Sequence, residues 1–106
     1  MPKFLIQGSY SSDGLKGLLK EGGTGRKTTL ENLARSLGGN IEGLYYAFGE
    51  DDVYVIGEFP DNVTAAAVCI AAGASGAVRT KTVLLLTPEE IDQAARKSVD
   101  YRPPGA

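Results

Sequence analysis

The stretch from Asn40 to Phe59, NIEGLYYAFGEDDVYVIGEF, contains two apolar runs separated by an acidic turn. The runs Asn40–Phe48 and Val53–Phe59 are rich in the β-branched and aromatic residues that favour strands. Between them, Gly49–Asp52 (GEDD) has the composition of a tight turn. We therefore predict two consecutive strands joined by this turn, the second and third strands of the domain.

The chain outside these two strands supplies further strands and helices. Lys3–Tyr10 (KFLIQGSY) and Val78–Leu86 (VRTKTVLLL) have the composition of strands, and the alanine-rich segment Val63–Ser75 favours a helix. The sequence Thr87–Glu90 (TPEE) combines a capping box with a proline at the first helical position. It predicts a last helix that ends at about Lys97.

A broken helical pattern lies between the first two strands. Ser11 or Ser12 is a plausible N-cap, and leucines at helical spacing follow it. The glycines of Gly22–Gly25 interrupt this pattern, which then resumes as far as Leu37. We expect two helical segments with a break between them.

The predicted order is βαββαβ with a terminal helix, which defines a ferredoxin-like α+β fold. We expect a four-stranded antiparallel sheet in which the first and third strands lie parallel at the centre. Right-handed crossovers place both long helices on one face. The prediction is a single domain over residues 1–98, followed by a flexible tail, 99–106, that is mobile or lies against a neighbouring molecule.

Three strand segments are apolar on both sides, namely Tyr45–Phe48, Val53–Ile56 and Val83–Leu86. A strand that is apolar on both faces must be covered on both. A chain of 106 residues lacks a second layer for the open face. We therefore expect a second copy to cover it, sheet against sheet, in a homodimer of the dimeric α+β barrel type or in a higher homo-oligomer.

The composition argues against several functional classes. The chain has no histidine, which excludes His-based triads and His-ligated zinc or haem. A single cysteine, Cys69, excludes an internal disulfide, and a net charge of −2 argues against nucleic-acid binding through bulk charge. With neither a signal peptide nor an apolar membrane span in view, we expect a cytoplasmic protein without metal or cofactor and without a nucleic-acid or membrane partner.

Three stretches of the chain resemble the GYD-domain proteins. They are Lys3–Gly25 (KFLIQGSYSSDGLKGLLKEGGTG), the turn Phe48–Asp52 (FGEDD) and Ser75–Thr82 (SGAVRTKT). The resemblance extends to about Lys97 and implies a small bacterial protein in the dimeric α+β barrel superfamily, from a family of uncharacterised function. The Gly-Tyr-Asp motif of that family falls at the turn, where this chain has Asp51 in place of the tyrosine.

The segment 49–82 is also similar to the effector-binding domains of Lrp/AsnC-type regulators. Those domains have a Gly-x-x-Asp turn, a helix, and a Gly-Val-x-x-Thr-x-Thr segment that leads into the last strand. In that family these parts lie near a subunit interface that binds amino acids. The similarity implies ligand-binding roles for Gly49, Asp52, Gly76, Thr80 and Thr82.

The acidic turn allows two interpretations. The carboxylates of Glu50, Asp51 and Asp52 belong to the class that binds hard cations. Adjacent residues rarely converge on one ion, so we favour a solvated turn. In that turn Gly49 takes a positive φ and Asp52 accepts a hydrogen bond from its own turn backbone.

The glycine-rich segment Gly22–Thr28 (GGTGRKT) departs from a phosphate loop, because Arg26 stands where the pattern requires a glycine before Lys27. A looser interpretation keeps Arg26 and Lys27, with nearby backbone N–H groups, as an anion site. The alternative is a flexible helix break with a solvated basic end.

Arg79 and Lys81 lie two residues apart on the last predicted strand and so share one face. We expect Lys3 and Gln7 to join them, because the first and last strands are neighbours in this topology. Such a row would meet an anionic ligand inside the dimer. The alternative is that both cations pair with acidic residues of the neighbouring strands, Glu42 or Glu58.

We therefore expect a non-catalytic homodimeric module that binds a small, anionic metabolite at or near the dimer interface. The alternative is a cofactor-free dimeric-barrel enzyme, oxygenase- or isomerase-like, acting on an aromatic or dicarbonyl substrate through Tyr45, Tyr54 and Lys81. That enzyme requires a closed, apolar pocket of several hundred Å³ between sheet and helices. The candidate ligand-binding residues are Tyr45, Gly49, Asp52, Gly76, Arg79, Thr80, Lys81 and Thr82.

Overall fold

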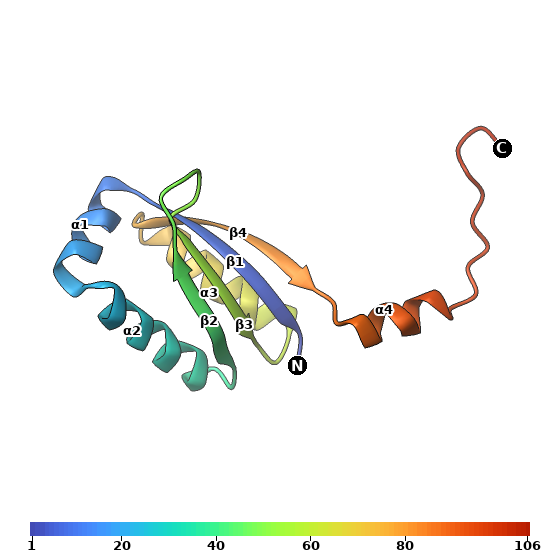
Figure 1. Ribbon diagram of the computed structural model, residues 1–106, viewed down its shortest axis with the longest axis horizontal. Coiled ribbons are helices and arrows are strands. Elements are labelled where there is room, and N and C mark those ends of the chain that lie inside the picture. Colours follow the sequence, from blue (N-terminus) through green and yellow to red (C-terminus); the bar gives the residue numbers. More distant parts are fainter.

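The computed structural model describes residues 1–106 and contains one sheet and four helices (Figure 1). The strands are β1 (Lys3–Tyr10), β2 (Asn40–Tyr46), β3 (Val53–Glu58) and β4 (Val78–Leu85). The helices are α1 (Ser12–Glu21), α2 (Gly23–Ser36), α3 (Asn62–Ala74) and α4 (Pro88–Ala95). The element order confirms the predicted βαββαβ pattern with a terminal helix.

The sheet has the strand order β2-β3-β1-β4, and every neighbouring pair is antiparallel. This confirms the four-stranded antiparallel sheet, but the expectation that β1 and β3 run parallel is wrong. In their pairing Phe4 lies opposite Gly57, and Gly8 lies opposite Val53. Each helical crossover joins two parallel strands, β1 to β2 and β3 to β4, and one other strand lies between the two that it joins. The parallel strands are therefore never neighbours.

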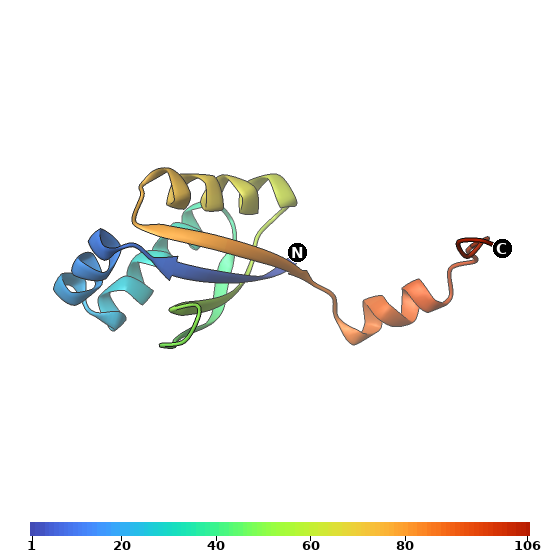
Figure 2. The same cartoon turned by 90° about the horizontal axis from the view of Figure 1, so that it is seen from above.

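Helices α2 and α3 cover the same face of the sheet, as predicted. The buried core brings together Phe4 of β1, Ala34 of α2, Phe59 after β3 and Ala65 of α3. Because both helices reach this cluster, they pack from the same side. Figure 2 shows α3 lying along that side of β1 and β4.

The opposite face of the sheet, called the open face below, has no helix against it. On β3 the side chains alternate, since Val53 and Val55 are buried against the helices whereas Tyr54 and Ile56 are half-buried. Register assigns the other open-face residues, which are Lys3, Leu5, Gln7, Ser9, Tyr45, Glu58, Arg79, Lys81, Val83 and Leu85.

The predicted helix break between the first two strands is present. The Ser11 side chain accepts a hydrogen bond from the Gly14 backbone N–H at 3.1 Å, so Ser11 caps α1. Gly22 separates α1 from α2 and has a φ of +82°, a conformation that glycine adopts without steric cost. The Tyr46 hydroxyl donates to the backbone oxygen of Gly23 at 3.0 Å and so ties the start of α2 to β2.

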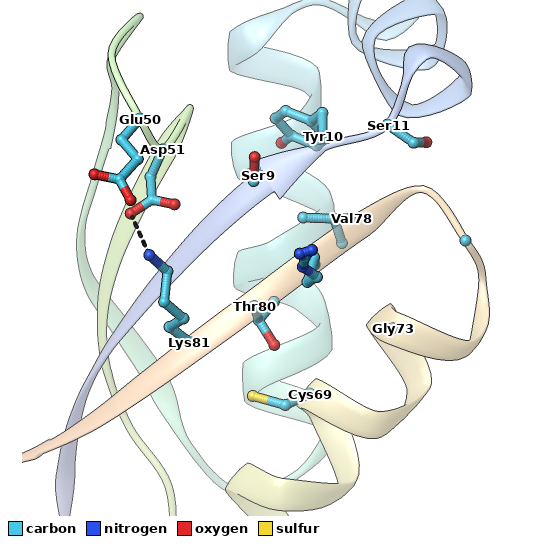
Figure 3. A pocket seen from close by; sticks show the side chains of 12 residues that line it. Ser9, Tyr10, Ser11, Glu50, Asp51, Cys69, Gly73, Val78, Thr80 and Lys81 are labelled. Carbon is cyan, nitrogen blue, oxygen red and sulfur yellow. Dashed lines mark ion pairs between the residues drawn. The ribbon is translucent and has the colours of Figure 1, made fainter.

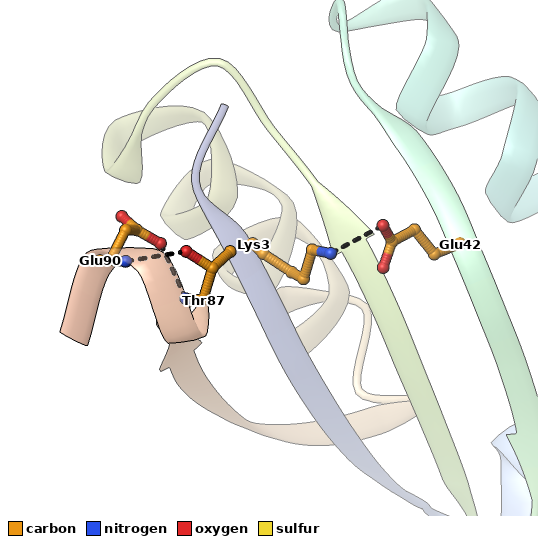
Figure 4. A network of polar contacts seen from close by, with 4 residues as sticks. All are labelled: Lys3, Glu42, Thr87 and Glu90. Carbon is orange, nitrogen blue, oxygen red and sulfur yellow. Dashed lines mark hydrogen bonds and ion pairs between the residues drawn. The ribbon is translucent and has the colours of Figure 1, made fainter. Parts of the chain in front are cut away.

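The last 21 residues, 86–106, extend away from the sheet as a C-terminal arm (Figures 1 and 2). Inside the arm, Thr87 and Glu90 form the predicted capping box at the start of α4 (Figure 4). Every residue of α4 is exposed. The arm raises the radius of gyration to 16.9 Å, against about 13 Å for a typical domain of this length.

None of the helices has the length and apolar character that crossing a lipid bilayer requires.

Gly14 provides a test of how α1 is seated. A Cβ at this buried position would lie 2.0 Å from the backbone oxygen of Ala77, the same oxygen that accepts from the Ser11 N–H at 2.9 Å. We expect Gly14→Ala to lower the free energy of unfolding by about 1–3 kcal/mol, as overpacking does. Urea denaturation followed by circular dichroism measures this change.

Gly17 is the matched control, because nothing lies within 4 Å of a Cβ built there on the same helix. Gly17→Ala should raise stability by about 0.5–1 kcal/mol through helix propensity alone. Equal stability changes in the two variants would contradict this packing of α1.

Candidate functional site

The predicted basic row lies on β4. Register places Arg79 opposite Ser9 and Lys81 opposite Gln7 on the open face, so Gln7 joins the row as expected. Lys3 does not join it, because its ammonium pairs with the Glu42 carboxylate at 2.8 Å (Figure 4). That carboxylate, by accepting a hydrogen bond, raises the pKa of Lys3.

Lys81 has a different partner from either one predicted. Its Nζ lies 3.3 Å from Oδ2 of Asp51 (Figure 3). The Gln7 amide donates to the same oxygen at 3.4 Å. The alternative considered from the sequence, in which Lys81 pairs with Glu42 or Glu58, is therefore wrong. The turn after β2 carries Asp51 back to the open face of β1 and β4, where these two donors hold it.

The acidic turn is not the solvated turn that we favoured. Asp51 is only 5% exposed, and Gly49 does not take a positive φ. Asp52 accepts a hydrogen bond at 2.8 Å from the backbone N–H of Tyr10, on β1, and not from its own turn. Two backbone hydrogen bonds of Asp52, to Gly8 and Ala47, complete the attachment of the turn to the sheet. The turn is therefore a structural clamp.

A hollow of about 970 Å³ at the β4 edge brings together half of the predicted site (Figure 3). Gly76, Arg79, Thr80 and Lys81 all line it, beside the hydroxyl-bearing residues Ser9 and Ser11 and the acidic residues Glu50 and Asp51. Arg79 is exposed and forms neither an ion pair nor a side-chain hydrogen bond within the chain. Contrary to the pairing considered from the sequence, it faces neither Glu42 nor Glu58, so the hollow contains one uncommitted cation.

The other predicted residues lie elsewhere. Thr82 is on the helix side of β4, where its hydroxyl lies 3.1 Å from the Cys69 sulfur. Tyr45 is on β2, which two strands separate from β4, and is 70% exposed. Gly49 and Asp52 do not line the hollow. The structure therefore does not gather the eight candidate residues into one site.

The groups proposed for an enzyme do not share a pocket either. Between the sheet and the helices lie a small pit of about 80 Å³ and a groove of about 650 Å³, and both are partly open to solvent. Tyr45, Tyr54 and Lys81 line neither of them, because all three side chains lie on the open face.

Three residues on the helix side form a polar cluster that we did not predict. Burial raises the pKa of Tyr10, and the guanidinium of Arg26 beside it opposes that rise. Burial also raises the pKa of Tyr46. The sequence signals were the placement of Tyr10 on the helix face of β1 and the basic pair in the glycine-rich segment. Lys27, the second member of that pair, does not line the pit or the groove with Arg26.

No group of three or more acidic, cysteine or histidine side chains is placed to hold a metal ion. In the acidic turn, Asp51 and Asp52 already accept hydrogen bonds from β1.

The strand order, the two helices on one face and the hairpin clamp define a ferredoxin-like α+β domain. Residues 4–95 match the model of the GYD domain, so the chain belongs to the GYD-domain family. A search of curated proteins and a search of solved structures each returned no match to this chain.

The clamp function of Asp52 can be tested by substitution. Asp52→Ala removes the acceptor of the Tyr10 N–H and should lower the free energy of unfolding by about 1.5–3 kcal/mol, the range for hydrogen bonds to charged groups. Glu50→Ala, at an exposed position of the same turn, should stay within about 0.5 kcal/mol of the unmodified protein. Equal losses in both variants, measured by urea denaturation, would show that the turn contributes only through its charge.

Proposed function

We propose that this GYD-domain protein is a non-catalytic homodimeric module that binds a small anionic ligand beside the subunit interface. The dimer rests on the open face and the C-terminal arm. The ligand site rests on Arg79 and the hollow around it.

The open face carries an apolar row across three strands. Leu5 lies between Ile56 of β3 and Val83 of β4 in register. Leu5 and Ile56 are half-buried, and Val83 is exposed. No segment of the same chain covers this row. An apolar row at the middle of a sheet favours a second sheet face as its cover.

The solvent-exposed area of the chain is large enough for a stable interface with a second copy. The chain exposes 7329 Å², whereas a monomer of its mass exposes about 5,700 Å². The excess of about 1,600 Å² is twice the area, about 800 Å² per partner, that a standard stable interface removes. A second copy is the partner that this chain always has available, and a two-fold axis lets one patch cover itself.

The arm supports the same conclusion. Helix α4 has eight residues and no neighbouring element, and isolated helices of this length are marginal in water. It presents Ile91, which is 51% exposed, and the tail beyond it presents Val99 and Tyr101. A contact outside the chain would stabilise the helix and cover these side chains. We propose that the second copy provides it.

The uncommitted cation carries the ligand proposal. Arg79 has no ion-pair partner in the chain, and Ser9 and Gly76 line the same hollow. A guanidinium presents paired donors that match a carboxylate or phosphate. The hollow has no histidine, and the carboxylate of Asp51 is already engaged by Lys81. This arrangement favours binding of a small anion over acid–base chemistry.

The dimer is tested by a charge on the open face. Ile56→Glu should weaken dimerisation at least about 100-fold, because an unpaired charge buried at an interface costs several kcal/mol. Sedimentation equilibrium measures the change. Ile70→Glu is the matched control, because Ile70 is 71% exposed on α3, away from the open face. A folded monomer of 11.1 kDa at micromolar concentration for the unmodified protein would overturn the dimer.

The ligand is tested with a panel of amino acids, small carboxylates and inorganic phosphate. At least one should raise the melting temperature of the unmodified protein. Arg79→Gln should weaken its binding at least about tenfold, as the loss of a charge-assisted contact does. Arg35→Gln, which removes an exposed cation of α2, should leave binding unchanged. A flat response across the whole panel would contradict the proposed binding function.

A further inference from the structure

The face of the sheet that the helices cover is not closed. Helices α2 and α3 leave an open groove of about 650 Å³ between them. Leu30 and Leu33 of α2 form one wall, and Val68 and Ala72 of α3 form the other. Helix α3 is rich in alanine, so the side chains available to fill the space beside α2 are short. The groove falls within the size range of small-molecule sites, about 300–1,000 Å³.

A small, apolar pit of about 80 Å³ lies between the same helices and the sheet. The four wall residues of the groove line the pit as well, and so do Tyr10 and Arg26. The two cavities therefore form one depression with an apolar floor. A ligand that filled it would remove apolar surface from water on both helices at once.

Arg26 is the charge that reaches into this depression. It is half-buried, it lines both the groove and the pit, and it forms no ion pair in the chain. Asp13 and Glu21 also line the groove, but both are exposed, and Glu21 accepts a hydrogen bond from the Thr29 hydroxyl at 2.9 Å. The acidic groups are therefore solvated at the rim, whereas the cation is partly withdrawn from water without a counter-charge.

We propose that this groove is a second binding site, for a small carboxylate with an apolar body such as an alkyl or aryl chain. The carboxylate pairs with Arg26, beside the Tyr10 hydroxyl, and the apolar body lies between α2 and α3. The site goes beyond the proposed function, because Arg26 and Arg79 are on opposite sides of the sheet. Tyr10 and Val78 line both the groove and the hollow, so the two sites are told apart by their arginines.

The test is a titration of the full-length protein with butanoate, hexanoate and octanoate by isothermal calorimetry. Affinity should rise about fourfold for each added methylene that enters the groove. Octanol and octylamine supply the same body with a neutral or a cationic head. Arg26→Gln should weaken octanoate at least about tenfold and leave octanol unchanged.

Two further variants separate this site from the others. Ala71→Phe places a ring at the exposed rim of the groove on α3, and it should block octanoate and octanol alike while the circular dichroism spectrum is retained. Arg79→Gln should leave octanoate binding unchanged, so that failure here and failure of the anion hollow are distinguishable.

Several results would overturn the proposal. One is an affinity that does not depend on chain length, and another is tighter binding of octylamine than of octanoate, which would assign the groove to Asp13 and Glu21. A third is loss of octanoate binding in Arg79→Gln. The fourth result concerns the variant Ile91→Asp, which places a charge on α4 of the C-terminal arm. Octanoate binding that is absent in the unmodified protein and appears only in this variant would show that the arm of a second copy occupies the groove.

Discussion

A four-stranded sheet has two faces, and the helices of this chain cover one of them. Both crossovers place their helices on the same side, where Phe4, Val53 and Val55 are buried. The other side keeps an apolar row, with Leu5 at its centre, that no part of the chain covers. The hydrophobic effect is roughly proportional to the apolar area removed from water. This uncovered row and the exposed side chains of the C-terminal arm are the two surfaces on which the proposed dimer rests.

The parts of the fold that the sequence predicted are those fixed by nearby residues. The capping box at Thr87, the cap at Ser11 and the break at Gly22 each depend on groups within one helical turn. The relative direction of β1 and β3 does not, because it follows from how many strands a crossover skips. The sequence also did not predict that α4 lies away from the sheet. A helix of eight residues has the same capping signals whether or not it packs against other elements.

In the candidate site, too, the features set by nearby residues were predicted, and the contacts between distant residues were not. The period of two along a strand predicted that Arg79 and Lys81 share a face, and the register confirms it. The partner of Lys81 was missed because Asp51 comes from a turn that folds back over β1, a contact between residues 30 positions apart. The favoured interpretation of that turn treated it as local, with Gly49 at a positive φ and Asp52 bonded to its own backbone. Its actual hydrogen bonds reach β1, and only the folded sheet brings those groups together.

The same alternation limits what one ligand can touch on β4. Arg79 and Lys81 point to the open face, whereas Thr80 and Thr82 lie on the face of α3. A ligand paired with Arg79 in a dimer seam cannot contact Thr82, because the strand itself lies between them. Thr82 instead meets Cys69 of α3, a packing contact inside one chain. The site expected from the sequence, which placed Arg79 and Thr82 around one ligand, is therefore not assembled in this chain. Thr80 is the exception, because it lines the hollow at the β4 edge together with Arg79 and Lys81.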